Sequence, residues 1–419
     1  MPLLYRSQEG IIMLATLIPF FDKDMKVCAY SLFSQKHNLL LQPSLLGSRK
    51  NDGAASVDGL DIIKSIGIDT LSPGSDVFVP VGNIAIFSDA FSQNDPMRGR
   101  LTLLFDQSIA NDNVYIPKLT ELKSWGYKLA IRKLPVMEFE TNKELLSLMD
   151  YIILDTKKID VRKAKIYFGH LHPNIKICVG NIDKQSEFDS LCDDPSFVLF
   201  EGSFYRLPIN NGETEVSPLK ANYLELLNMV NDNDFELTKA ADIISRDTAM
   251  VVSLLDMVNH ISINSEITSI RHAAAMLGQK ELKKWINTAV TKELCTDKPN
   301  EVTRLSLLRA KFMEQLAPVF GLAMKSSELF LMGLFSVLDL ILNLPLEEAL
   351  QKVNLSQEII DALVYQKGDL APVYKFLLCY ENADWQEISR QMIVMNESSD
   401  VVYDAYIASV QWYKDLFFS

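Results

Sequence analysis

The chain changes its pattern of apolar residues once, near Pro208. Before that point, short β-branched and aromatic runs alternate with amphipathic segments of helical spacing; after about Asn211 only the helical spacing continues. Alternating strands and helices build a parallel sheet, whereas consecutive helices pack against one another as a bundle. The sequence therefore predicts an α/β domain followed by an all-α domain.

The first half contains enough predicted strands to close a TIM-like α/β barrel. We place strands at residues 14–21, 27–33, 76–81, 101–105, 128–134, 151–155, 175–180 and 197–201, with helices at 57–66, 116–125, 142–149, 161–171 and 184–191. We assign the barrel to residues 1–208, a polar linker to 209–216 and the all-α domain to 217–419.

Composition narrows the class of protein. The formal net charge of −13 over 419 residues argues against a general nucleic-acid binder, which would show a basic face. The five cysteines are scattered without a CxxC pair, which indicates reduced thiols in a cytoplasmic protein. The longest apolar stretch, 329–346, is interrupted by polar residues and proline, and no signal peptide is evident. We expect a cytoplasmic protein without a membrane span.

The predicted strand ends carry unexpected residues for a metal-dependent hydrolase. An α/β barrel places its chemistry there. We find at or near these ends Ser31, Pro80, Leu103, Arg132, Lys133, Ile153, Cys178 and Asn181. None is an Asp or Glu, the ligands that Mg²⁺ and Ca²⁺ need. A cation about 4 Å from a metal opposes it by about 4 kcal/mol at an effective dielectric of about 20. We expect no catalysis, no metal and no cofactor.

Several of these segments resemble EAL domains, the barrels that hydrolyse cyclic di-GMP. Residues 27–33 (VCAYSLF) resemble the signature strand, with Ser31 in the place of its glutamate. Leu103 stands in the place of a metal-binding acid, Arg132 and Lys133 in the places of paired aspartates, and Ile153 in the place of the catalytic lysine. The resemblance implies an EAL barrel that has kept the framework and lost the chemistry.

The second half resembles an HDOD domain, a helical relative of the HD phosphohydrolases, at residues 241–247, 254–259 and 267–278. Residues 333–339 (GLFSVLD) stand where a catalytic HD protein reads G-L-L-H-D, so Ser336 replaces the histidine of the His-Asp metal pair. The order of the two halves is similar to that of two-domain EAL–HDOD bacterial signalling proteins, and the resemblance covers nearly the whole chain.

Some polar residues admit a structural interpretation. Asp339 and Glu381 fall in otherwise apolar helices, and we expect a buried cation such as Arg309 to pair with them. The His170-Leu171-His172 sequence lacks a Cys or carboxylate partner nearby, and we interpret it as a helix end rather than a metal site.

The resemblance implies a non-catalytic signalling or scaffold protein that acts through protein–protein contacts, in a cyclic di-GMP, motility or stress pathway. One alternative is a metal-independent nucleotide sensor that uses Arg132 and Lys133 at the barrel mouth as anion ligands. The least favoured alternative is an active cyclic di-GMP phosphodiesterase. We expect a protein partner, no nucleic acid and no small-molecule ligand, and we leave open whether the chain forms a homo-oligomer.

Overall fold

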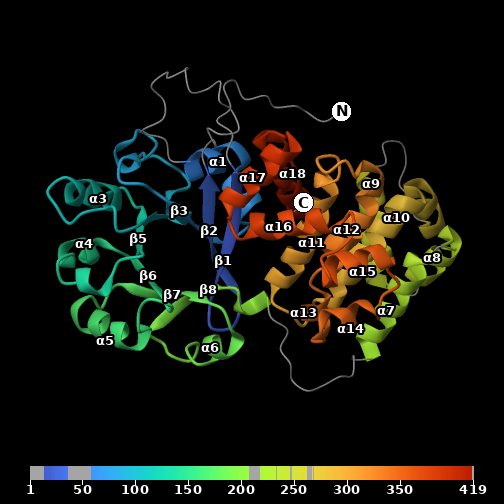
Figure 1. Ribbon diagram of the computed structural model, residues 1–419, viewed down its shortest axis with the longest axis horizontal. Coiled ribbons are helices and arrows are strands. Elements are labelled where there is room, and N and C mark those ends of the chain that lie inside the picture. Colours follow the sequence, from blue (N-terminus) through green and yellow to red (C-terminus); the bar gives the residue numbers. More distant parts are fainter. Residues whose placement is uncertain are drawn as a thin grey trace. The chain divides into compact units, whose positions relative to one another are not determined.

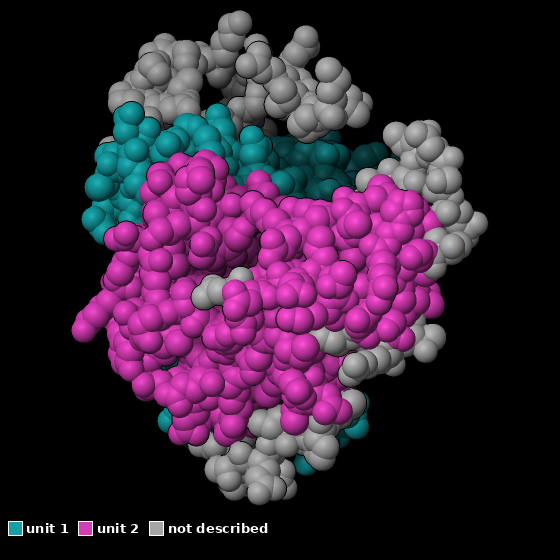
Figure 2. All heavy atoms as spheres, turned by 90° about the vertical axis from the view of Figure 1, so that its right-hand side faces the viewer, with its two compact units in different colours: residues 1–207, 376–419 teal, residues 208–375 magenta. Residues whose placement is uncertain are grey.

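The computed structural model describes residues 14–35, 58–206, 218–232, 234–245, 248–261, 267 and 269–417 (Figure 1). The chain forms two compact units, one of residues 1–207 with 376–419 and one of residues 208–375. Figure 2 colours the first unit teal and the second magenta.

Eight strands close into a barrel in chain order. Strands β2 to β8 run parallel, and β1 is antiparallel to both of its neighbours, β2 and β8. The strands are β1 (Leu14–Phe21), β2 (Val27–Gln35), β3 (Asp76–Pro80), β4 (Leu101–Phe105), β5 (Lys128–Arg132), β6 (Tyr151–Asp155), β7 (Lys176–Ile182) and β8 (Phe197–Gly202). The predicted TIM-like barrel is confirmed.

One side chain from each strand fills the barrel interior. These residues form a single buried cluster: Phe20, Ala29, Phe78, Leu104, Ala130, Ile153, Cys178 and Leu199. Such a layer makes the interior a packed core rather than a pore. It also fixes which residues of each strand point inward, because side chains alternate between the two faces of a strand.

Short helices connect the barrel strands: α1 (Asp58–Ile66), α2 (Ile68–Leu71), α3 (Tyr115–Ser124), α4 (Lys143–Leu148), α5 (Val161–Leu171) and α6 (Gln185–Asp189). Helix α5 begins where the Asp160 carboxylate accepts the N–H of Lys163 and ends at His172, its C-cap. The His172 ring is buried, with Nδ1 3.4 Å from the hydroxyl oxygen of Ser147. The helix end expected at this sequence is confirmed.

The C-terminal helices pack on the barrel. They are α16 (Ala371–Glu381), α17 (Trp385–Met395) and α18 (Ser399–Phe417), and α18 contacts β1 and α2 (Figure 1). The buried Tyr380 hydroxyl donates to the carbonyl of Ala15 on β1 at 2.8 Å. Arg206, just past the last strand, pairs with Glu381 at 3.3 Å. Glu381 therefore has a cation partner at the end of the barrel.

The compact units divide the chain differently from the predicted domains. We assigned residues 217–419 to the all-α domain, whereas residues 376–419 group with the barrel in one compact unit. The sequence pattern gives helix type but not the surface on which a helix packs. A helical period alone could not reveal that the last segment covers β1.

The second unit is helical throughout its described residues. It contains α7 (Pro218–Asn231), α8 (Leu237–Ile244), α9 (Thr248–Ile261), α10 (Ile270–Leu294), α11 (Asn300–Leu316), α12 (Ser326–Phe335), α13 (Leu338–Leu342), α14 (Leu346–Leu350) and α15 (Gln357–Val364). Helix α12 approaches α11 so closely that a Cβ on Gly333 would lie 2.5 Å from the carbonyl of Arg309. Among the described residues, no helix combines the length and apolarity needed to cross a membrane.

We predict that Tyr380→Phe weakens the attachment of the C-terminal helices to β1. The substitution removes the hydroxyl that bonds both the N–H and the C=O of Ala15, at 3.4 and 2.8 Å. Leaving buried main-chain groups without this partner costs about 1–3 kcal/mol. Hydrogen exchange should show faster exchange of the β1 amides. Tyr115→Phe, a half-buried tyrosine of the same unit, is the matched control. Unchanged β1 protection in Tyr380→Phe would contradict the prediction.

Candidate functional site at the barrel mouth

The barrel mouth is defined by the side chains one layer above the interior cluster. Because the inward-facing positions recur every second residue, they lie two residues beyond each interior residue of β2 to β8. They are Ser31, Pro80, Asp106, Arg132, Asp155, Gly180 and Glu201. We call this set the barrel mouth.

An ion pair lies at the centre of the barrel mouth. Arg132 Nη2 is 3.5 Å from Glu201 Oε2, and the side chains are only 17% and 7% exposed. The Arg132 guanidinium also lies over the Phe33 ring, 5.3 Å from its centroid. Burial raises the pKa of Glu201, the positive charge of Arg132 lowers it again in part, and the negative charge of Asp155 adds to the rise. The pair thus places a cation where the resemblance implies paired aspartates.

The pair does not satisfy all of its own hydrogen-bonding groups. Within the described residues, Arg132 Nε and Nη1, Glu201 Oε2 and Ser31 Oγ are buried without a hydrogen-bond partner. Buried polar groups in folded proteins are normally hydrogen-bonded, to protein or to ordered water. The barrel mouth therefore offers donors and acceptors that water or a ligand can pair.

The two predicted anion ligands are not brought together. Arg132 faces the barrel mouth, whereas Lys133 is exposed and turns the chain with a φ of 60°. Consecutive residues of a strand point to opposite faces, so adjacent cations at a strand end diverge. Asn181 is likewise exposed, with a φ of 61°. Of the two candidates, only Arg132 belongs to the barrel mouth.

Three of the predicted strand-end residues lie elsewhere. Ile153 and Cys178 belong to the interior cluster, one layer below the mouth. Leu103 is buried next to interior Leu104 and so faces the opposite side of the strand. The order of residues along the chain shows that these positions lie near strand ends. Only the two-residue alternation shows which of them face the barrel interior and which face its outer surface.

Leaving out this alternation hid three carboxylates. We expected no acid at the strand ends, but Asp106, Asp155 and Glu201 are all mouth positions. They lie two residues beyond interior residues of their strands, a spacing that can be read in the sequence. The expectation of a mouth without carboxylates is wrong, and what distinguishes this mouth is the cation beside them.

The chemistry open to the mouth is limited. Among the residues that the structure describes, no three His, Cys, Asp or Glu side chains converge in a way suited to a metal ion. Cys178 is fully buried, and burial raises the pKa of its thiol, with the negative charge of Glu201 adding to the effect. A thiol held protonated is a poor nucleophile. The mouth is built to hold a charged pair.

A second arginine lies at the GLFS segment of the helical unit. The Ser336 hydroxyl donates to the carbonyl of Gly333 at 2.7 Å and accepts from Arg309 Nη1 at 3.1 Å. Burial raises the pKa of Asp339, and the positive charge of Arg309 opposes that rise. The predicted interaction of Arg309 with Asp339 is confirmed as an electrostatic one.

Comparison with known proteins identifies the helical half. The HDOD domain family matches residues 216–363. This chain carries an HDOD domain. A Bacillus subtilis protein, the uncharacterized protein YuxH, is 26% identical over 412 residues, covering 95% of this chain and 97% of that protein. The Vibrio cholerae cyclic di-GMP phosphodiesterase CdgJ is 28% identical over 222 residues, which is 52% of this chain and 51% of that protein.

Solved structures similar to this chain include EAL proteins. The EAL-like domain protein YdiV covers 46% of this chain at 13% identity with a TM-score of 0.35. A standalone EAL protein from Vibrio cholerae O395, solved with cyclic di-GMP bound, covers 46% at 14% identity with a TM-score of 0.33. The structure and the family match confirm the predicted order of a closed eight-stranded barrel followed by a helical domain of HDOD type.

We predict that Arg132→Met destabilises the barrel and makes its stability pH-dependent. Removing one partner of a buried ion pair costs about 3–5 kcal/mol. Without Arg132, the pKa of Glu201 rises further above its unfolded value. The protonated Glu201 carboxyl then contributes its full stability at pH values below the pKa that it has in the unfolded chain. This stability is lost as the pH rises through the higher pKa of the folded state. Urea unfolding of Arg132→Met should show a larger loss at pH 8 than at pH 5.

The double variant R132M/E201Q is the control for this prediction. The neutral amide removes the buried charge, so the double variant should recover part of the stability and lose the added pH dependence. Equal losses for the single and the double variant at both pH values would show that Arg132 contributes packing alone.

Proposed function

We propose that the chain is a non-catalytic bacterial signalling protein, related to cyclic di-GMP pathways, that acts through protein–protein contacts. The observation that carries the proposal is Arg132 in the barrel mouth, paired with Glu201. The relation to cyclic di-GMP is supported by the similarity to CdgJ, whose name gives it as a cyclic di-GMP phosphodiesterase and of which this chain spans about half the length.

Electrostatics supports the absence of metal-dependent hydrolysis. Two-metal catalysis needs ions about 4 Å apart, held by converging carboxylates. Here two of the mouth carboxylates, Asp155 and Glu201, share their site with the guanidinium of Arg132. A fixed cation beside these carboxylates repels a divalent ion. Ser31 supplies a hydroxyl where the resemblance implies a further acid.

Exposed apolar side chains support a role in protein contacts. They lie in the loops that follow three neighbouring strands: Ile84 and Phe87 after β3, Val114 after β4, and Val136 and Met137 after β5. The Phe87 and Tyr115 rings, 5.6 Å apart, join the first two loops. These loops surround the carboxyl ends of the strands, so the apolar residues form a rim beside the barrel mouth. Apolar groups gathered at one place on a surface are typical of interaction sites.

We predict that the purified full-length chain releases no linear dinucleotide from cyclic di-GMP with Mg²⁺ or Mn²⁺. The physical reason is the repulsion between Arg132 and a metal at the mouth. Product is measured by chromatography, beside a catalytically active EAL protein. Turnover that disappears in the E201Q and D155N variants would overturn the assignment, because it would place hydrolysis at this mouth.

We also predict that a charge on the rim weakens partner capture. The M137D and V114D variants should lose most of the partner protein that the wild-type chain retains from its native lysate, because they place a carboxylate in an apolar contact. Ile166→Asp on α5 is the matched control, since Ile166 is 58% exposed and Val114 is 60% exposed. Equal recovery of the same partner, identified by mass spectrometry, with all three variants would remove the rim from the proposal.

A metal-independent ligand sensor is the second candidate. The unpaired Arg132 Nε and Nη1 and the unpaired Ser31 Oγ favour it, because a ligand with acceptor oxygens would satisfy them. Lys133, the other predicted anion ligand, is exposed and does not belong to the barrel mouth, so it does not support this candidate. Calorimetric titration of cyclic di-GMP in the presence of EDTA separates the candidates, since a sensor binds without metal and a scaffold does not bind.

A further inference from the structure

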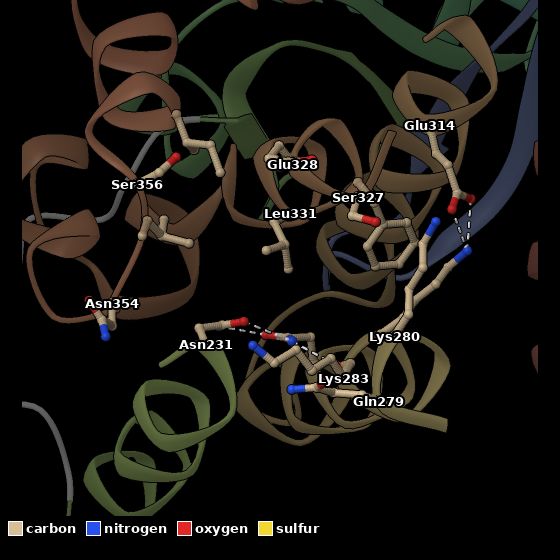
Figure 3. A pocket seen from close by; sticks show the side chains of 15 residues that line it. Asn231, Gln279, Lys280, Lys283, Glu314, Ser327, Glu328, Leu331, Asn354 and Ser356 are labelled. Atoms are coloured by element: carbon tan, nitrogen blue, oxygen red, sulfur yellow. Dashed lines mark hydrogen bonds and ion pairs between the residues drawn. The ribbon is translucent and has the colours of Figure 1, made fainter. Parts of the chain in front are cut away.

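The HDOD-containing unit has a cavity that the proposed function does not use. It has a volume of about 580 Å³ and is lined by α10, α12, the start of α15 and the ends of α7 and α11. Figure 3 shows the polar side chains around it. A cavity of this size is within the range of small-molecule sites, which is roughly 300–1,000 Å³.

Three lysines on one helix face line this cavity. Lys280, Lys283 and Lys284 are spaced three and four residues apart on α10, which places them on the same side of the helix. Like charges at this spacing repel one another. Lys284 is neutralised by Glu314, with its Nζ 2.7 Å from both carboxylate oxygens, and Glu314 also binds Lys311. Lys283 Nζ donates to the main-chain carbonyl of Asp232 at 3.0 Å and lies over the Phe235 ring, 5.0 Å from its centroid. Among the described residues, neither Lys280 nor Lys283 forms an ion pair like that of Lys284 with Glu314.

The lysines also stand at a helix start, where cations are unfavourable. Gly278 interrupts α10 with a φ of 74° and a ψ of 171°, so a new helical segment begins at Gln279. Lys280 lies in its first turn and Lys283 at the start of its second. The N-terminus of a helix carries a partial positive charge and stabilises anions rather than cations. An anion bound here would be stabilised by this helix start as well as by the lysines.

Two further helix starts border the same cavity. Ser327 and Glu328 belong to the first turn of α12, and Ser356 is the N-cap residue of α15. Neither N-cap residue, Lys325 nor Ser356, accepts a capping hydrogen bond with its side chain. The N–H groups in the first turn of a helix have no partner within the helix and are suited to phosphate oxygens. Burial lowers the pKa of Lys283, as expected for an ammonium group short of solvent.

The remaining lining residues form the walls of the cavity and are not proposed as phosphate ligands. The amides of Asn231 and Asn287 bond each other in both directions, at 2.9 and 3.1 Å, and so fix α7 to α10. Leu331 and Ile359 add apolar surface. Glu328 also lines the cavity, and no ion pair like that of Glu314 with Lys284 is found for it among the described residues. Its negative charge favours ligands of low charge over large polyanions.

We propose that this cavity binds a small organic phosphate, held by Lys280 and Lys283 at the start of the second α10 segment and opposite the helix starts of α12 and α15. From the sequence we expected no small-molecule ligand. The cavity forms only where α10, α12 and α15 pack together, and no local sequence pattern predicts that packing. The site lies within residues 208–375 and is separate from the barrel mouth.

Calorimetry on the full chain tests the proposal, with pyrophosphate and AMP as probes and adenosine as the uncharged counterpart of AMP. Both phosphates should bind and adenosine should not. The K280Q and K283Q variants should each weaken phosphate binding by about tenfold, the loss expected for one charge-assisted hydrogen bond. Lys280 is exposed, so its substitution leaves the core intact. Lys292→Gln, on the same helix beyond the cavity, is the matched control and should bind as the wild type does.

A further variant separates electrostatics from damage to the fold. Glu328→Gln removes an acid from the wall and should tighten phosphate binding severalfold, a gain that a damaged cavity cannot produce. Three results would overturn the proposal: no binding of either phosphate, equal affinity in wild type and the two lysine variants, or citrate binding as tightly as pyrophosphate.

Discussion

The buried ion pair between Arg132 and Glu201 is the constraint on which the barrel mouth depends. Burying two charges is costly, and a pair of this kind persists only where each charge compensates the other. The guanidinium lies beside Glu201 in the mouth that Asp155 and Ser31 also line, and its charge affects which groups can bind there. A divalent ion would have to displace or overcome a fixed positive charge. Anionic or hydrogen-bonding groups would meet unpaired donors instead.

Each of the two units has a buried arginine at or beside a position that the resemblance singles out. In the barrel, Arg132 stands where the EAL resemblance implies aspartates; in the helical unit, Arg309 bonds Ser336, which stands where the HD resemblance implies a histidine. Each arginine lies close to a carboxylate, Glu201 in one case and Asp339 in the other. In both units a buried arginine thus lies close to a carboxylate and shares its site with a serine. The strands and helices depend on apolar residues, so the fold does not require a particular polar residue at these positions.

The sequence predicted the elements well and the inward-facing side chains less well. All eight strands follow from β-branched and aromatic runs, since these strands are buried on both faces and read as nearly continuous apolar segments. For the same reason their alternation is hard to see, and Leu103 was taken for a mouth residue while Asp155 was overlooked. The C-terminal helices show the equivalent problem: their period predicts helices, but the contact of Tyr380 with Ala15 joins residues that are 365 positions apart.

By itself, the sequence determined the order of a barrel and a helical domain, and the presence of Ser31 and Arg132 at strand ends, because apolar periods and residue types are local properties of the chain. Only the tertiary structure decided which side chains meet. Ring closure of the barrel brings Arg132 on β5 to Glu201 on β8, and helix packing encloses the three lysines of α10 beside two other helix starts. Such encounters depend on distances between segments remote in sequence, which no local pattern encodes.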